Sequence, residues 1–384
     1  MTEPVLDEDW SVPTTTVMRG IRRTLDADGT GVLATIVSVD GSAYRRPGAK
    51  MVLSAAGNGL GSITAGCLED EVRTLAEEVQ EEGRPRLETF DLVGEDDVWG
   101  LGLGCNGVID LLLEPVGEAY RPVIDAYEAG ERVAVLTVLE SDGTDLALGD
   151  RLQVAPEDFP LDGPADWPAW LLEDLGDPVA DLLENGQSRT LTSERDGETV
   201  RVFVDAVTPP ADLVVFGTGH DVGPVVDLAG TLEFRVTVVG FRGAEGLEDR
   251  FPDADRVITT RPADVTDALE FDGDTYTVVM THNFVDDQLV LEELLDTDVP
   301  YVGLMGPSER FERLLDVLAE GGDPVGDAAL DRLYAPIGLD LGGGTPHSIA
   351  LSIVGEVQAV EHGRDPGHLR DRKSPIHDRL DLEP

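Results

Sequence analysis

The stretch Leu213-Val-Val-Phe-Gly-Thr-Gly-His-Asp221 places a short apolar run directly before a turn that contains two glycines. Four further apolar runs follow, each with a helix-like segment behind it, at Arg235–Val239, Arg256–Thr259, Tyr276–Met280 and Tyr301–Leu304. Strands that alternate with helices at this spacing are typical of a doubly wound parallel sheet. We therefore expect an α/β domain of this kind in the C-terminal half, closed by an amphipathic helix at 347–361.

The N-terminal half alternates strands and helices less regularly. Strands are predicted at 31–39, 50–54, 59–63, 107–113 and 132–139, and helices at 68–83 and 121–128. Five prolines blur the pattern between Ser141 and Val200, and no strand can be assigned there. The segment Val207-Thr-Pro-Pro-Ala-Asp212 is short and stiff, which favours a domain boundary. The sequence thus predicts a mixed α/β domain over 1–206, the doubly wound domain over 212–362, and a charged tail over 363–384.

The chain is strongly acidic, with 77 acidic and 28 basic residues and a formal net charge of -49. The acids are spread along the whole length, and lysine occurs only twice. At molar salt the Debye length is about 3 Å, so such a charge is screened, whereas in dilute buffer it strains the compact state. This pattern favours a halophilic protein over an ordinary acidic cytosolic one. The negative field also argues against nucleic acid and anionic membranes as partners.

The compartment is expected to be the cytoplasm. The first residues are acidic and lack the apolar run of a signal peptide, and no stretch approaches the ~18 apolar residues of a membrane span. Two cysteines, Cys67 and Cys105, do not make a disulfide framework, so both thiols are expected to be reduced.

Three cations gather within six residues of this acidic chain, at Arg45, Arg46 and Lys50. Lys50 is one of two lysines in the protein; the other is Lys373. A chain that nearly excludes lysine, yet places one beside two arginines, points to a bound anion. We expect these three side chains to bind a phosphate-like group.

Both cysteines lie in glycine-flanked segments, Gly66-Cys67 and Gly104-Cys105-Asn106-Gly107. Cys67 also precedes a predicted helix, a position that favours the thiolate form. The alternative is that both thiols only pack, as buried free cysteines usually do. Two cysteines without clustered histidines cannot complete a structural zinc site. Cations and a thiol along one segment suggest an anionic ligand that is sulfur-reactive or carries a metal.

The glycine turn at Gly217 and Gly219 lies between a strand and a helix, where backbone N–H groups can bind phosphate. The third glycine of a dinucleotide fingerprint is displaced, and the acid expected after the second strand is replaced by Gly240-Phe241-Arg242. Arg242 could meet a second phosphate, whereas NAD is only weakly indicated. A turn needed solely for packing remains the alternative. His282 follows a strand at the expected ligand-binding edge, either as a phosphate donor or as a structural cap.

Taken together these residues resemble the XdhC/CoxI family of xanthine dehydrogenase accessory proteins, over most of the chain. The N-terminal likeness rests on the Arg-Pro-Gly-Ala loop, the Gly-Cys-Leu-Glu motif and a second cysteine motif in which Asn106 stands where glycine is common. The C-terminal likeness is to a Rossmann-like domain. It rests on Phe-Gly-Thr-Gly at 216–219, Arg-Phe-Pro-Asp-Ala-Asp at 250–255, Thr-His-Asn at 281–283, Tyr-Val-Gly-Leu-Met-Gly-Pro at 301–307 and Ala-Pro-Ile-Gly-Leu-Asp at 335–340. The family often has Asp-His-Arg where this chain has 240–242.

The resemblance implies a molybdenum-cofactor chaperone rather than a catalyst. Such a protein binds the cofactor, molybdopterin or its nucleotide form, protects it during sulfuration and passes it to a molybdenum hydroxylase such as xanthine or carbon monoxide dehydrogenase. It further implies a homodimer, a hydroxylase apoenzyme as partner and a cysteine desulfurase-type sulfur donor. The implied cofactor-binding residues are Arg45, Arg46, Lys50, Cys67, Cys105, Gly217, Gly219, Arg242 and His282, with Cys67 as a molybdenum contact.

Two other classes compete with this interpretation. An NAD(P)-dependent oxidoreductase would use the C-terminal half, but no ribose contact and no acid–base pair for hydride transfer are visible in the sequence, so NAD(P) is disfavoured. A scaffold that docks a target enzyme without a ligand would not need the cation cluster at Arg45, Arg46 and Lys50.

Overall fold

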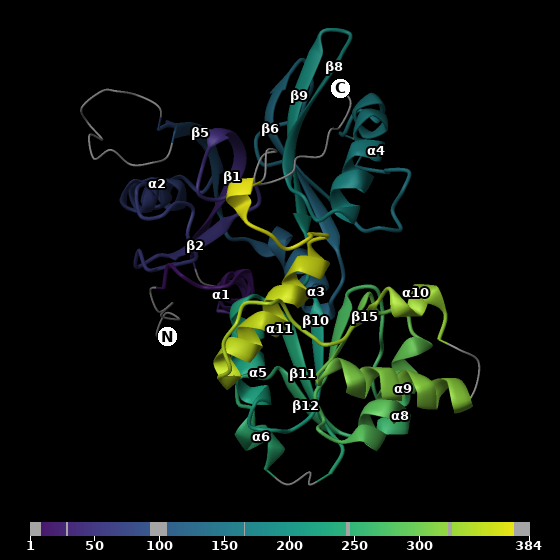
Figure 1. Ribbon diagram of the computed structural model, residues 1–384. Coiled ribbons are helices and arrows are strands. Elements are labelled where there is room, and N and C mark those ends of the chain that lie inside the picture. The colour runs from purple at the N-terminus through teal and green to yellow at the C-terminus, as the bar shows by residue number, and fades with distance from the viewer. Residues whose placement is uncertain are drawn as a thin grey trace. The chain divides into compact units, whose positions relative to one another are not determined.

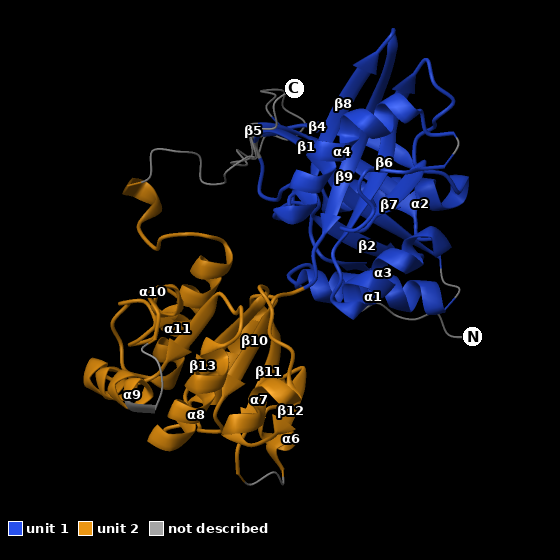
Figure 2. Ribbon diagram, turned by 90° about the vertical axis from the view of Figure 1, so that its right-hand side faces the viewer, with its two compact units in different colours: residues 1–209, 379–384 blue, residues 210–378 orange. Residues whose placement is uncertain are grey.

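The computed structural model describes residues 9–27, 30–92, 106–164, 166–242, 246–321 and 325–371. The chain divides into two compact units, one ending at Pro209 and the other beginning at Pro210 (Figure 2). No helix in the described ranges is long and apolar enough to cross a membrane.

The N-terminal unit contains a five-stranded antiparallel sheet, here called sheet A. Its strands are β1 (Gly31–Ser42), β2 (Lys50–Ser54), β3 (Gly59–Leu60), β4 (Arg86–Asp91) and β5 (Asn106–Pro115). They are ordered β3-β2-β1-β5-β4, with β1 and β5 paired over their whole lengths. β3 is shorter than the predicted strand at 59–63, because Gly61 turns the chain with a φ of 86°.

Alternation along β1 gives sheet A two apolar faces. Helix α2 (Glu69–Glu82) packs Val72, Ala76 and Val79 on the face that carries Val32 and other even-numbered residues of β1. Helices α1 (Thr14–Asp26) and α3 (Arg121–Ala129), the latter preceded by the 3-10 turn η1 (Glu118–Tyr120), pack against Leu33 and Val52 on the other face. Both faces of sheet A are therefore covered.

The segment in which the sequence predicts no strand forms a second antiparallel sheet, sheet B, and one helix. Its strands are β6 (Val133–Asp142), β7 (Arg151–Val154), β8 (Arg189–Arg195) and β9 (Glu198–Val207), ordered β7-β6-β9-β8. Helix α4 (Ala169–Glu184) covers one face of this sheet and contains Pro178. The other face meets sheet A through a buried apolar cluster of Val37, Leu112, Leu139 and Phe203.

The C-terminal unit is a six-stranded sheet, sheet C, in which every neighbouring pair is parallel. Its strands are β10 (Asp212–Phe216), β11 (Arg235–Gly240), β12 (Arg256–Thr259), β13 (Thr275–Val279), β14 (Tyr301–Leu304) and β15 (Leu333–Tyr334). The order β12-β11-β10-β13-β14-β15 is that of a Rossmann sheet. Strands β11 and β12 are added on one side of β10 and strands β13 to β15 on the other, so the strand order reverses between β10 and β13. The predicted combination of a mixed α/β domain with a doubly wound parallel sheet is confirmed.

Helices cover both faces of sheet C (Figure 1). Helices α5 (Val222–Thr231) and α11 (Pro346–Glu361) pack on one face, and α7 (Val265–Ala268), α8 (Phe284–Leu295) and α9 (Ser308–Gly321) on the other. The short elements are α6 (Leu247–Arg250), α10 (Asp327–Leu330), η2 (Pro262–Asp264) and η3 (Leu369–Asp371). Burial on both faces explains why the strands read as continuous apolar runs in the sequence.

Candidate functional site

Three connections leave sheet A at the same edge, meaning the same end of its strands. Strands β1, β3 and β4 all run toward this edge, and β2 and β5 start from it, because every neighbouring pair in the sheet is antiparallel. The connections are the loop 43–49, the loop 61–68 and the segment 92–105. The first carries Arg45 and Arg46, and the second carries Cys67. Residues far apart in the sequence are thereby gathered at one end of the unit.

Two close contacts show that these connections begin near one another. A methyl group at Gly61 would lie 2.7 Å from the carbonyl oxygen of Lys50, so loop 61–68 starts against the end of loop 43–49. Ser42, the last residue of β1, pairs with Asn106, the first residue of β5. Cys105 itself lies outside the described residues, and its predicted role is not tested.

The loop 43–49 presents its side chains to solvent. Tyr44 is 65% exposed, Arg46 is exposed and Arg45 is half-buried. Within the described part of the chain no carboxylate pairs with either arginine, whereas many other arginines have an acidic partner, as Arg22 has in Asp125. Two cations without an internal acid, beside an exposed aromatic ring, are suited to an anionic ligand that also carries a ring.

Lys50 has a different environment from its two neighbours. Its side chain is 6% exposed. Nζ donates to the Gly48 carbonyl at 3.0 Å and to Asp205 Oδ1 at 2.8 Å, and it forms an ion pair with Asp205 Oδ2 at 2.7 Å. An ammonium group has three N–H donors, and these two hydrogen bonds use two of them. The structure therefore places Lys50 at the end of the predicted loop, with its charge buried and paired with Asp205.

The loop that carries Cys67 is fixed by two buried side chains. The Glu69 carboxylate accepts from the Thr64 backbone N–H, the Thr64 hydroxyl and the Leu68 N–H. The Thr64 oxygen in turn accepts from the Cys67 N–H at 3.1 Å. Cys67 is half-buried and packs against the apolar cluster beneath α2. Ala65 and Gly66, immediately before it, are exposed.

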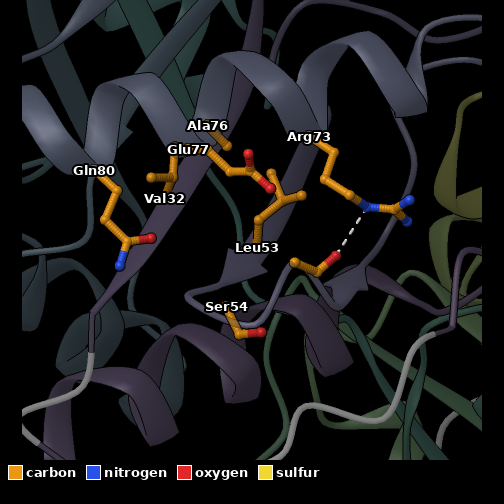
Figure 3. A pocket seen from close by; sticks show the side chains of 8 residues that line it. Val32, Leu53, Ser54, Arg73, Ala76, Glu77 and Gln80 are labelled. Carbon is orange, nitrogen blue, oxygen red and sulfur yellow. Dashed lines mark hydrogen bonds between the residues drawn. The ribbon is translucent and has the colours of Figure 1, made fainter.

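The surroundings of Cys67 do not form a metal cage. Across the described residues, no group of three or more His, Cys, Asp and Glu side chains is placed to bind a metal ion. A small pocket lies elsewhere in this unit, between α2 and strands β1 and β2, lined by Ser54, Arg73 and Gln80 among others (Figure 3). It has room for about one water molecule and is too small for a pterin.

In the C-terminal unit, the predicted glycine turn lies at the point where the strand order reverses. A methyl group at Gly217 would lie 2.5 Å from the Met280 carbonyl oxygen, so only glycine lets the turn pass β13 this closely. Gly219 is covered by two side chains, since a methyl group there would lie 2.2 Å from Asp221 Oδ1 and 3.3 Å from His282 Nε2. His282 and Asp221 are hydrogen-bonded at 2.9 Å.

Arg242 reaches the same edge of sheet C. Its guanidinium donates to Asp286 at 2.7 Å, and Asp286 is buried in the first turn of α8. The adjacent Asp287 is also buried and accepts from Arg310 and Thr281. At the position of the missing ribose-binding acid, a methyl group at Gly240 would lie 2.8 Å from Leu247 and 3.1 Å from Thr218.

The structure brings Gly217, Gly219, Arg242 and His282 to one edge, as predicted from the position of each after a strand. Sequence reasoning missed the acids that bind two of them, Asp221 and Asp286. The available signal for Asp286 was its place in the pair of acids that follows Asn283 in the sequence. The Asn283 side chain caps α8 by accepting from the N–H groups of Val285 and Asp286. Asp205, the partner of Lys50, carried no local signal.

An antiparallel α/β unit with cations and a cysteine at one end of its sheet, joined to a Rossmann-type unit, defines a two-unit α/β protein. Family models identify the class further: the XdhC and CoxI family model matches residues 24–91, and the XdhC Rossmann domain model matches residues 213–357. The chain is also 31% identical to a probable xanthine dehydrogenase subunit of Bacillus subtilis, over 85% of this chain and 92% of that protein. The chain belongs to the XdhC and CoxI family.

Two further relatives extend the likeness. The molybdenum cofactor insertion chaperone PaoD of Escherichia coli is 24% identical over 94% of this chain and 96% of its own. A crystal structure described as a xanthine dehydrogenase from Bacillus halodurans superposes with a TM-score of 0.70 at 31% identity, covering 91% of this chain and 96% of that one.

Proposed function

We propose that this protein is a maturation factor that binds the molybdenum cofactor, protects it while its terminal sulfur is installed, and delivers it to a molybdenum hydroxylase. Xanthine dehydrogenase and carbon monoxide dehydrogenase are the hydroxylases that the family relationship favours. The observation that carries the proposal is that the loop with Arg45 and Arg46 and the loop with Cys67 leave sheet A at the same end.

The chemistry of this edge fits the chemistry of the cofactor. Molybdopterin has a phosphate, a pterin ring and a dithiolene-bound molybdenum, and a nucleotide can extend the phosphate. Arg45 and Arg46 would bind the phosphate by charge-assisted hydrogen bonds. Tyr44, exposed beside them, would stack on the pterin ring. Cys67 would guard the molybdenum end, since a thiolate is a suitable ligand for a soft metal centre. The chemistry that the cofactor supplies belongs to the hydroxylase that receives it.

The second set of predicted residues lies in the C-terminal unit, where we propose a separate site for an anionic ligand. Gly217 and Gly219 form the turn after β10, and Arg242 and His282 lie at the same end of sheet C, each hydrogen-bonded to a carboxylate that a ligand would have to share or displace. Cys105, beside the start of β5, is a second candidate for the metal end.

An NAD(P)-dependent oxidoreductase is the alternative, and the Rossmann-type sheet favours it. The side chains at the point where the strand order reverses disfavour the binding of a dinucleotide. The Asp221 carboxylate lies over Gly219, where a pyrophosphate would meet a like charge. The position of the ribose-binding acid is Gly240, which is packed against Leu247 and Thr218.

The accessory role implies partners and a compartment. A hydroxylase apoenzyme would receive the cofactor, and a cysteine desulfurase-type protein would supply the sulfur. We further propose a homodimer that acts in the cytoplasm. The protein itself would act as a carrier rather than as a catalyst.

The experiment that tests the proposed function is purification in high salt from molybdate-fed cells. Elemental analysis should find molybdenum, and oxidation of the extract should release a fluorescent pterin. Mixing the loaded protein with a hydroxylase apoenzyme should then generate activity. Bound NAD(P) without molybdenum would instead support the oxidoreductase, and protein that carries neither and transfers nothing would contradict the proposal.

A further inference from the structure

Lys50 and Asp205 form a buried ion pair between two sheets of the N-terminal unit. Lys50 begins β2 in sheet A, Asp205 lies in β9 of sheet B, and both side chains are 6% exposed. Burying two charges costs a large desolvation penalty, so a buried pair is weak evidence for stability alone. The other contacts of the pair indicate a role beyond stability.

The pair is connected to the turn at the end of loop 43–49. Lys50 Nζ donates to the Gly48 carbonyl oxygen, two residues before it in the chain. Asp205 also accepts from the Ser188 hydroxyl at 3.2 Å, and the Ser188 oxygen accepts from the Ala206 N–H. A methyl group at Gly48 would lie 2.7 Å from Ser188 Oγ, and Gly48 has a φ of 95°. Ser188, the residue before β8, thus packs closely on Gly48, and Lys50, itself paired with Asp205 of β9, donates a hydrogen bond to the Gly48 carbonyl.

The two sheets do not depend on this pair to stay together. A second buried pair joins Arg151 of β7 to Glu114 of β5 at 2.5 Å, and the Thr190 hydroxyl donates to the Val37 carbonyl at 2.7 Å. An apolar cluster fills the space between the sheets. What distinguishes Lys50 from these contacts is its bond to the loop that carries Arg45 and Arg46.

We propose that Lys50 and Asp205 are positioning residues, which hold the Gly48 turn so that Arg45 and Arg46 are presented at the edge of sheet A. Lys50 then acts on the phosphate of the cofactor through the arginines and does not touch it. This inference rests on the proposed function for its ligand. The positioning of the loop by Lys50 does not depend on the proposed function, because it follows from the contacts of Lys50 with Gly48 and Asp205.

The test separates positioning from stability by removing both charges together. Lys50→Met and Asp205→Leu each leave an unpaired buried charge and should lower the Tm. The double variant replaces the pair by apolar side chains of similar volume and should regain the Tm. It nevertheless lacks the donor to the Gly48 carbonyl. The matched control is Arg151→Met with Glu114→Leu, which removes the other ion pair between the sheets. Arg151 contacts Thr137, Glu114 and Tyr120, none of which lies in loop 43–49.

Two readouts are taken on each protein. Amide hydrogen exchange at Gly48 and Ala49 reports on the loop, because these N–H groups bond to Ile36 and Arg46 carbonyls. Retention of isolated molybdopterin, measured by the fluorescence of its oxidised form, reports on the arginines. We expect faster exchange at both amides in the Lys50–Asp205 double variant, with retention weakened about tenfold or more, the loss expected when a charge-assisted hydrogen bond to the phosphate is misplaced. The control should keep both properties.

A second variant removes any dependence on folding of the double variant. Gly48→Ala keeps the ion pair but forces the turn away from Ser188, and it should also weaken retention. Wild-type exchange in the Lys50–Asp205 double variant, or wild-type retention in it despite faster exchange, would overturn the positioning role while leaving the proposed function intact. If wild-type protein retains no molybdopterin, the proposed function fails, and hydrogen exchange still decides whether the pair holds the loop.

Discussion

The Thr64 hydroxyl lies 2.9 and 2.7 Å from the two carboxylate oxygens of Glu69, and both side chains are buried. Through this contact the first residue of α2 fixes the loop that precedes the helix. The Cys67 N–H donates to the same Thr64 oxygen. Glu69 therefore fixes the position of the cysteine indirectly, through Thr64.

Replacing Glu69 should therefore loosen the Cys67 loop. Glu69→Gln loses one acceptor oxygen and leaves a buried donor unsatisfied, which should lower the free energy of unfolding by about 1–3 kcal/mol. Cys67 should react faster with a thiol reagent, because the loop opens more often. Asp70→Asn is the control, since Asp70 lies on the same turn and its side chain is fully exposed. Equal thiol reactivity in both variants would mean that Glu69 does not hold the loop.

Cys67 itself should matter more for cofactor binding than for folding. It lies half-buried at the margin of the cluster beneath α2, so Cys67→Ala should lower the free energy of unfolding by only about 1 kcal/mol. Bound molybdenum should fall, or activation of a sulfur-dependent hydroxylase should fail. Stability and molybdenum content are measured on one sample. A variant with wild-type molybdenum and normal transfer would show that Cys67 only packs.

The exposed arginine of the loop should be essential for ligand retention. Arg46→Glu should abolish retention of a molybdopterin-derived fluorophore and leave the circular dichroism spectrum unchanged, because Arg46 has no acidic partner among the described residues. Arg84→Glu is the matched charge reversal. Arg84 is exposed beyond the far end of α2, a 14-residue helix about 21 Å long, and should have no effect. Equal ligand content in the two variants would refute the assignment.

The aromatic ring beside the arginines should contribute by stacking. Tyr44 is exposed and packs against no core cluster, so Tyr44→Ala should not change the Tm. Loss of a stacked ring costs about 1–3 kcal/mol, which predicts an affinity for molybdopterin weaker by roughly five- to 150-fold in a fluorescence titration. Tyr44→Phe keeps the ring and should bind normally. Should the alanine variant bind as tightly as the phenylalanine variant, the pterin does not lie on Tyr44.

Salt should stabilise the whole protein. With a formal net charge of -49 spread over the chain, self-repulsion is strong in dilute buffer and screened at molar salt. The Tm should rise steeply between dilute and molar KCl, as followed by circular dichroism. A Tm that does not change over this range would contradict the halophilic interpretation.

The C-terminal unit could be predicted well from the sequence because its strands are buried on both faces and its turns contain glycine. Local patterns of this kind identify β10 and the Gly217 turn without any knowledge of distant residues. The region of β7, α4 and β8 could not be predicted, because prolines usually end helices, yet Pro178 lies inside α4.

The candidate site was predictable in its members and not in their partners. Arg45, Arg46 and Cys67 were evident from composition and motif. The buried pairing of Lys50 with Asp205 joins residues 155 positions apart and depends on how two sheets pack, which no local pattern encodes. The same holds for the contact of His282 with Asp221. The sequence therefore predicts Lys50 as a ligand contact, although its charge is already paired.

Packing of sheet B against sheet A limits how far the protein can be dissected. A fragment that ends with β5 at Pro115 would contain the loop 43–49, the Cys67 loop and the segment between β4 and β5. It would also leave the Lys50 ammonium without Asp205 and the apolar face of sheet A without its cover. Such a fragment would contain every candidate residue of this edge, but it would lack the contacts with sheet B that fix the position of loop 43–49.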